Sequence, residues 1–226
     1  MVDLAYNTAE LGPVEQTPDE QLADISSDLN VALLQDVVAA AYPFAVRFSD
    51  NAPAGSVNVE LQMCTVEFLR DRLHHFGWDK SNIGQVSCVI NRRDNVRIAC
   101  STDGGAFVGI KGAKSPTLRT KGKGTLRLAG IGGCFTPPLP GLENFAQGDD
   151  GLQKLDNLDF YYYLLRIDKK EGRVFSEFSQ PIFDREGVAR GWSKRIILPP
   201  VSAIPETSVT IKPAPTPEIS VVRKAS

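Results

Sequence analysis

The segment VSCVINRRDNVRIAC (residues 86–100) has the pattern of a β-hairpin, with apolar runs on both sides of a polar turn. The expected strands are 86–91 and 96–100, and the turn is Arg92–Asn95. A second hairpin is expected further along, where FYYYLLRI (160–167) and RVFSEF (173–178) flank the turn KKEG (169–172). These two hairpins predict a mainly antiparallel sheet in the second half of the chain.

Other strands are expected around the two hairpins. Short apolar runs punctuated by glycine predict strands near 106–111, 117–121 and 124–129, and WSKRIIL (192–198) predicts a last one. The sheet is therefore expected to contain six to nine strands. Between the hairpins, GIGGCFTPPLPG (130–141) is too rich in glycine and proline for regular structure.

Helix signals come before the sheet. In TPDE (17–20), Thr17 suits the N-cap, Pro18 the first helical position, and Glu20 can complete a capping box. Apolar residues then recur at helical spacing to about Ala41, with a break expected near Asn30, and the pair Tyr42–Pro43 is expected to end the helix.

A second helix is expected over residues 65–76, ended by Gly77. Between the two helices, the alternation of apolar and polar residues predicts strands at 44–48 and 57–63, separated by a loop at 49–56. The expected fold class is α+β, in which two N-terminal helices pack on a mainly antiparallel sheet and the terminal segments are extended.

The domain organisation follows from composition. Of the 226 residues, 42% are apolar, which is enough for a packed core. Residues 1–16 are polar and acidic, and we expect a flexible arm there. One α+β domain is expected over 17–198, with basic, glycine-rich strands and turns at 86–129. A proline-rich extended tail is expected over 199–226, because prolines cannot join a central sheet.

The cellular setting is also an expectation from sequence. No apolar run reaches the roughly 18 residues of a membrane helix, and the start of the chain lacks the pattern of a secretory signal. We therefore expect a cytoplasmic, non-secreted protein without membrane contact. In a reducing compartment the cysteines are expected to be reduced core residues, with Cys88 and Cys100 facing one another across the first hairpin.

The charge of the chain is unevenly distributed. The stretch from Arg92 to Arg127 carries a net charge of +7, whereas residues 1–60 carry −9 and the whole chain only −2. Clustered lysine and arginine attract phosphate and release its counterions, so this asymmetry favours binding of a polyanion. The acidic front is either a solvated surface or a cover that competes for the basic face.

Alternation along the expected strands brings the basic residues to one face, because every second side chain of a strand shares a side. Arg97 is expected to point outward while its strand neighbours point into the core. Phe107 is the one aromatic residue expected among them, so binding should be mostly electrostatic. The expected nucleic-acid-binding residues are Arg92, Arg93, Arg97, Phe107, Lys111, Lys114, Arg119, Lys121, Lys123 and Arg127.

Other site chemistries find little support. Neither a Walker loop nor a dinucleotide fingerprint has its glycines in place, and the two histidines, His74 and His75, point about 100° apart on a helix. Asp159, Asp168 and Lys170 faintly resemble the acid and lysine pattern of metal-dependent nucleases. However, the two acids lie at opposite ends of one expected strand. We therefore expect no catalytic residues, metal or cofactor.

The sequence thus favours a non-catalytic nucleic-acid-binding protein, with single strands preferred as ligand. The alternative is a structural or assembly protein that contacts neighbouring subunits through its extended termini, forming a homo-oligomer through the C-terminal tail. A metal-dependent nuclease is the third hypothesis.

Overall fold

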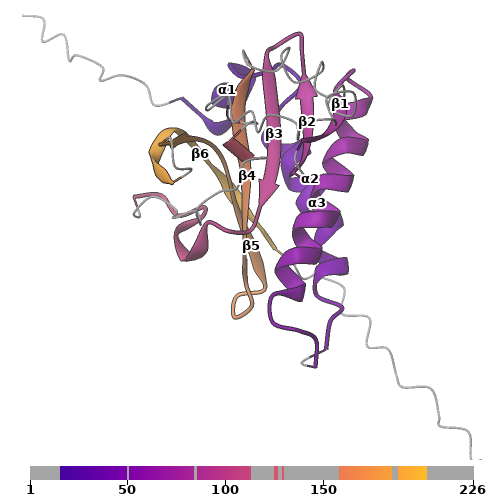
Figure 1. Cartoon of the computed structure of the whole chain (residues 1–226). Coiled ribbons are helices and arrows are strands. Elements are labelled where there is room, and N and C mark those ends of the chain that lie inside the picture. Colours follow the sequence, from indigo (N-terminus) through magenta and orange to yellow (C-terminus); the bar gives the residue numbers. More distant parts are fainter. Residues whose placement is uncertain are drawn as a thin grey trace, which may run out of the picture.

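The computed structural model describes residues 16–49, 51–83, 86–112, 125–126, 129, 158–184 and 188–202. Within these ranges the chain forms three α-helices, one short 3-10 helix and a six-stranded sheet, which is an α+β architecture (Figure 1). The helices are α1 (Pro18–Ala23), α2 (Val31–Ala45), α3 (Ser56–His74) and the 3-10 helix η1 (Gly105–Phe107). The strands are β1 (Asp79–Ile83), β2 (Val86–Asn91), β3 (Val96–Ser101), β4 (Asp159–Asp168), β5 (Arg173–Phe183) and β6 (Ala189–Ser202).

The strands lie in the sheet in the order in which they occur along the chain. All neighbouring pairs are antiparallel except β3 and β4, which are parallel. Both predicted hairpins are confirmed, as β2–β3 and β4–β5. A parallel pair cannot be joined by a tight turn. Residues 102–158 therefore return the chain from the end of β3 to the opposite end of the sheet.

The first predicted helix is two helices. The capping box of α1 is confirmed, because the Thr17 hydroxyl oxygen accepts the Glu20 N–H and the Glu20 carboxylate accepts the Thr17 N–H. Asn30 caps a separate helix, α2, by accepting the Leu33 N–H at 2.8 Å. Pro43 does not end α2, and the strand predicted at 44–48 is wrong. Proline removes one hydrogen bond from the last turn, and the carbonyl left without a donor belongs to the exposed Ala39.

The strand predicted at 57–63 is also wrong, because this segment forms the first two turns of α3. The alternation that suggested a strand overlaps with a helical pattern, in which Val57, Leu61, Thr65, Leu69 and Leu73 recur every four residues. The last four of these are buried, and Val57 packs against the same core. The longer helical pattern determines the structure, because it lets α3 pack beside α2 and over the sheet (Figure 1).

The strands differ from prediction in three places. The segment predicted as a strand at 106–111 contains the end of η1 followed by turns, and Thr125 and Leu126 are helical where a strand was predicted at 124–129. The strand predicted at 117–121 lies outside the described residues. The last strand continues through Pro199 and Pro200 to Ser202, four residues past the boundary predicted for the tail. Proline is tolerated there because β6 is an edge strand of the described sheet.

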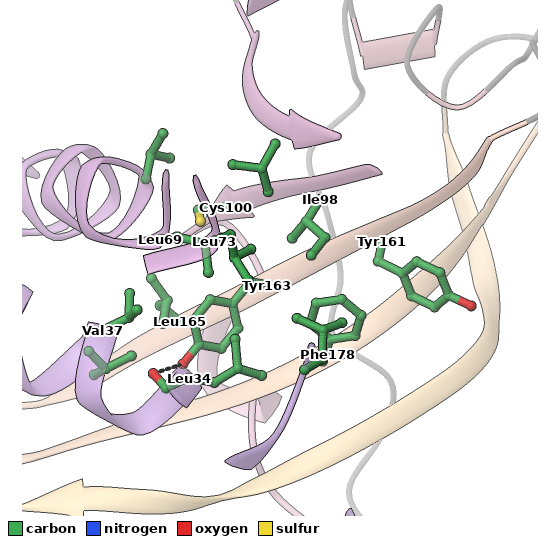
Figure 2. Packing of buried hydrophobic residues seen from close by; sticks show 14 of the residues in the cluster. Leu34, Val37, Leu69, Leu73, Ile98, Cys100, Tyr161, Tyr163, Leu165 and Phe178 are labelled. Carbon is green, nitrogen blue, oxygen red and sulfur yellow. Dashed lines mark hydrogen bonds between the residues drawn. The ribbon is translucent and has the colours of Figure 1, made fainter. Parts of the chain in front are cut away.

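The helices cover one face of the sheet, and the main core lies between these two layers. Tyr163, at the centre of β4, is fully buried and donates its hydroxyl hydrogen to the Leu34 carbonyl of α2 at 2.9 Å (Figure 2). A buried hydroxyl needs a partner, so this bond fixes α2 at one height over the sheet. The residues packed around it include Val37, Leu69, Leu73, Ile98, Cys100, Leu165 and Phe178 (Figure 2).

Cys88 and Cys100 do not face one another, which corrects the predicted thiol pair. Cys88 lies opposite Ala99, and the two cysteines point to opposite faces of the sheet. Both thiols are free and buried, and burial raises the pKa of Cys88 to about 11 and that of Cys100 to about 12. Within the described residues, no helix combines the length and apolarity needed to cross a bilayer.

The bond between Tyr163 and Leu34 predicts the effect of removing one oxygen atom. Tyr163→Phe should lower the free energy of unfolding by about 1 kcal/mol, because a buried hydrogen bond is lost without a large cavity. Urea denaturation followed by circular dichroism measures this change. Tyr42→Phe is the control, because Tyr42 of α2 is half-buried and its side chain forms no hydrogen bond within the described residues. Equal stabilities for the two variants would contradict this role of the bond.

Candidate nucleic-acid interface

The face of the sheet away from the helices is also covered. Ala99, Tyr162 and Leu164 point to this second face and are buried. They pack with Val108, which follows η1, and with Leu126 and Leu158. The connection from β3 to β4 therefore contacts the second face at three described points, Val108, Leu126 and Leu158.

Gly109 lies directly against strand β5. Its φ of +71° is a backbone conformation that residues with a side chain rarely adopt. A Cβ atom at this position would lie 2.9 Å from the Phe175 Cβ and 3.0 Å from the Ser176 nitrogen. The segment that follows η1 can approach the sheet this closely only because residue 109 is glycine.

The buried carboxylate of Glu177 in β5 binds the segment that follows η1. Glu177 is fully buried, and one of its oxygens accepts the Gly109 N–H at 2.9 Å. Arg195 of β6 donates to both oxygens, at 3.1 and 2.7 Å, and the Ser179 hydroxyl donates at 2.9 Å. A charge removed from water is stable only when such donors replace its hydration, and here four hydrogen bonds do so.

Arg166 of β4 forms a second link to this segment. Its guanidinium carbon lies 4.1 Å from the centre of the Phe175 ring, and its Nε donates to the Val108 carbonyl at 3.4 Å. This stacking and the Glu177 contacts fix residues 108 and 109 against β4 and β5. The residues around them are presented outward, since Phe107, Ile110 and Lys111 are all exposed.

The β2–β3 turn carries the first two predicted phosphate contacts. Arg93 forms ion pairs with Asp28 at 2.8 Å and with Asp94 at 3.0 Å. The pair with Asp28 links the turn to the α1–α2 connection. The hydrogen bond from Arg93, followed by that from the Ser26 hydroxyl, lowers the pKa of Asp94. Arg92 is exposed, and its Nε lies 3.6 Å from an Asp79 oxygen.

Arg97 does not lie at the surface, which corrects its predicted outward position. It points away from the helices as the alternation predicts, but only 1% of it is exposed because the second face is covered. Lys114, Arg119, Lys121, Lys123 and Arg127 lie outside the described residues. The structure thus places four predicted residues at the surface: Arg92 and Arg93 on the β2–β3 turn, Phe107 at the end of η1, and Lys111 on the turn that follows η1.

The helix layer has the opposite charge. Among the described residues between 16 and 78 there are eight acids and three arginines. Each arginine is engaged within the protein. Arg47 pairs with Glu60 and Arg72 with Asp36, both at 2.8 Å, and Arg70 donates to the Ser81 carbonyl at 2.7 Å.

The alternative chemistries remain separate in space. Asp159 and Asp168 stand at opposite ends of β4, and Asp168 accepts the N–H groups of Lys170 and Glu171 as part of the β4–β5 turn. The N–H of Glu171 is the main cause of the lowered pKa of Asp168. His74 and His75 are exposed at the end of α3. In the described part of the chain, no three His, Cys, Asp or Glu side chains are placed to hold a metal ion.

Comparisons of this chain with family models, with curated proteins and with solved structures find no match. The function is therefore argued from the residues and their geometry.

The close approach of Gly109 predicts a difference between two glycines. Gly109→Ala should lower the free energy of unfolding by at least about 2 kcal/mol, from backbone strain at positive φ and from the clash with β5. Gly112→Ala is the matched control, with φ +74° and no atom within 4 Å of the added Cβ, and should cost only about 1 kcal/mol. Urea denaturation measures both. The proposed packing against β5 would be contradicted by equal losses.

Proposed function

We propose that this protein binds nucleic acid through the basic part of the connection from β3 to β4, which covers the face of the sheet opposite the helices. The proposal is supported by the acidic helix layer and by the basic sequence of the connection from β3 to β4. The helix layer is acidic and its three arginines are engaged within the protein. Six of the predicted basic residues, from Lys111 to Arg127, belong to the connection that packs on the other face through Val108 and Leu126.

The attachment of this connection supports the proposal. Gly109 and Val108 are held to β5 and β4 by the contacts of Glu177 and Arg166. The structure describes the chain up to Gly112 and again from Thr125. The basic residues Lys114, Arg119, Lys121 and Lys123 lie between these two positions in the sequence. Val108 and Leu126, which flank this run in the sequence, belong to the same buried cluster on the second face.

Contacts to phosphate should supply most of the affinity. Phe107 is exposed and is the one aromatic residue of the predicted set, and stacking of one base on it contributes about 1–3 kcal/mol. Contacts to about five phosphates give a slope near −3.5 for log K against log salt with single strands. Because phosphate contacts outnumber base contacts, we expect the protein to recognise the sugar-phosphate backbone of the nucleic acid, with little dependence on base sequence.

The test is binding of a fluorescent single-stranded oligonucleotide, as DNA and as RNA, measured by anisotropy over a range of salt. The variant Arg119→Glu, Lys121→Glu, Lys123→Glu should abolish binding at about 50 mM salt and leave the circular dichroism spectrum unchanged. The matched control is Lys169→Glu, Lys170→Glu, Arg173→Glu, which makes the same change in net charge at the β4–β5 turn. This control should retain most of the affinity.

Two outcomes would overturn the proposal. A wild-type protein that binds neither DNA nor RNA at low salt has no such function. Equal losses in the two triple variants would show that net charge alone, and not the basic stretch, determines binding.

Assembly through an edge strand is the second candidate function. Strand β6 is 14 residues long, and no described strand pairs with its outer edge. Such an edge can pair with a second copy of the chain. Light scattering should then show the average mass rising with protein concentration. A monomer from about 1 to 100 µM, the range in which weak dimers form, would count against this candidate.

A further inference from the structure

Strands β2 and β3 separate at one end of the sheet. Their ladder ends at Cys88 opposite Ala99, and these two strands form no further pair within the described residues. Both strands nevertheless extend beyond this point, β2 from Val86 and β3 to Ser101. Each keeps its other neighbour there, since Val86 pairs with β1 and Ser101 with β4. The sheet is therefore open between β2 and β3 over two residues of each strand.

A cavity of about 570 Å³ lies at this opening. All four residues of the separated strand ends, Val86, Ser87, Cys100 and Ser101, line it. Helix α3, which runs along this side of the sheet, forms a further wall (Figure 1). The cavity also reaches Tyr162, which belongs to the buried cluster of the second face. Its volume lies within the range of small-molecule binding sites, about 300–1,000 Å³.

The separated strands direct main-chain groups into the opening. In a strand, the N–H and C=O of one residue point to the same side, and those of the next residue point to the other side. One residue of each separated pair therefore directs its N–H and C=O toward the opposite strand, across the opening. A ligand placed there can hydrogen-bond to these groups as a neighbouring strand would.

Three hydroxyl groups belong to the buried part of the cavity. Ser101, Thr125 and Tyr162 line it and are 6%, 7% and 3% exposed. Burial raises the pKa of Tyr162, and its hydrogen bond with Thr125 offsets part of this rise. The Ser101 oxygen accepts the Asp103 N–H at 3.2 Å, and its own hydrogen is donated to no described residue. The cavity thus offers a hydroxyl donor to a ligand.

The charges around the cavity are balanced. Two acids, Glu67 and Asp71, and two bases, Arg70 and Lys80, line it. Arg70 is fixed in place, because it donates to the Ser81 carbonyl at 2.7 Å. This balance favours an uncharged ligand, whose polar edge finds hydrogen-bonding groups and whose flat faces find apolar ones. The apolar side chains of the wall include Met63, Val66 and Cys100.

We propose that this cavity binds one nucleobase of a single strand whose phosphates contact the basic part of the connection from β3 to β4, so its ligand rests on the proposed function. A nucleobase is uncharged, with two apolar faces and a hydrogen-bonding edge, and proteins take unstacked bases into such pockets. The cavity and the basic residues are adjacent in the chain, because Lys123 precedes Thr125 by two residues. A strand bound at Lys123 therefore passes close to the cavity.

The test compares two fluorescent single strands of equal length by anisotropy, an ordinary oligonucleotide and one built from abasic units. Both carry the same phosphates, so the ratio of their affinities reports contacts to bases alone. The wild type should bind the ordinary strand about 100-fold more tightly, about tenfold from a base on Phe107 and about tenfold from a base in the cavity.

Met63→Trp fills the cavity from its edge and should lower this ratio to about tenfold. Met63 is 62% exposed, so the larger side chain is tolerated by the fold. Val59→Trp is the matched control, because Val59 lies one turn earlier on α3, is 57% exposed and does not line the cavity. It should keep the ratio of the wild type. Affinity for the abasic strand should be the same in all three proteins, which shows that the variants are folded.

The remaining outcomes separate failure of this inference from failure of the proposed function. If Met63→Trp keeps the full ratio, or if Val59→Trp loses as much, the cavity holds no base, although the protein still binds nucleic acid. If the wild type binds neither strand, the proposed function itself is overturned. Quenching of free 2-aminopurine nucleoside by the wild type, absent in Met63→Trp, would then show that the cavity binds the base of a free nucleoside. Absence of quenching in both would overturn the base site as well.

Discussion

The carboxylate of Glu177 is the interaction on which the second half of the fold depends. It accepts hydrogen bonds from Arg195 of β6, from Ser179 on its own strand and from the backbone of Gly109. Removing an ionised carboxylate from water costs several kcal/mol, and only the complete set of donors offsets this cost. The network is therefore formed as a whole, and it joins two strands to the connection that covers the sheet.

Local signals in the sequence predicted the parts of the fold that depend on few residues. The two hairpins and the capping box at Thr17 are encoded within short stretches, and all three are confirmed. The strand predicted at 57–63 failed because two periodicities overlap there, and burial against α2 favours the helical one. Pro43 was expected to end α2, but it lies in the last turn and the residue four positions before it, Ala39, is exposed, so the helix continues to Ala45.

The basic residues of the candidate site could be predicted from the sequence, but which of them lie at the surface could not. The basic stretch is visible in the sequence, whereas the burial of Arg97 follows from a cover supplied by residues distant in the chain. The ion pair between Arg93 and Asp28 could not be predicted for the same reason, since 65 residues separate the partners. Gly109 carried one signal, a glycine between apolar residues, but its close contact with β5 appears only in three dimensions.

The parallel pairing of β3 and β4 determines how freely the basic stretch can vary in length. The two strands are held in register by their own ladder, from Val96 opposite Asp159 to Ser101 opposite Leu164, and the connection between them spans residues 102–158. The entropy of closing such a loop grows only with the logarithm of its length, so doubling it costs about 0.6 kcal/mol. Insertions between positions 112 and 125 are therefore expected to lengthen the connection at little cost to folding. The anchors at Val108 and Leu126 define where this tolerance begins and ends.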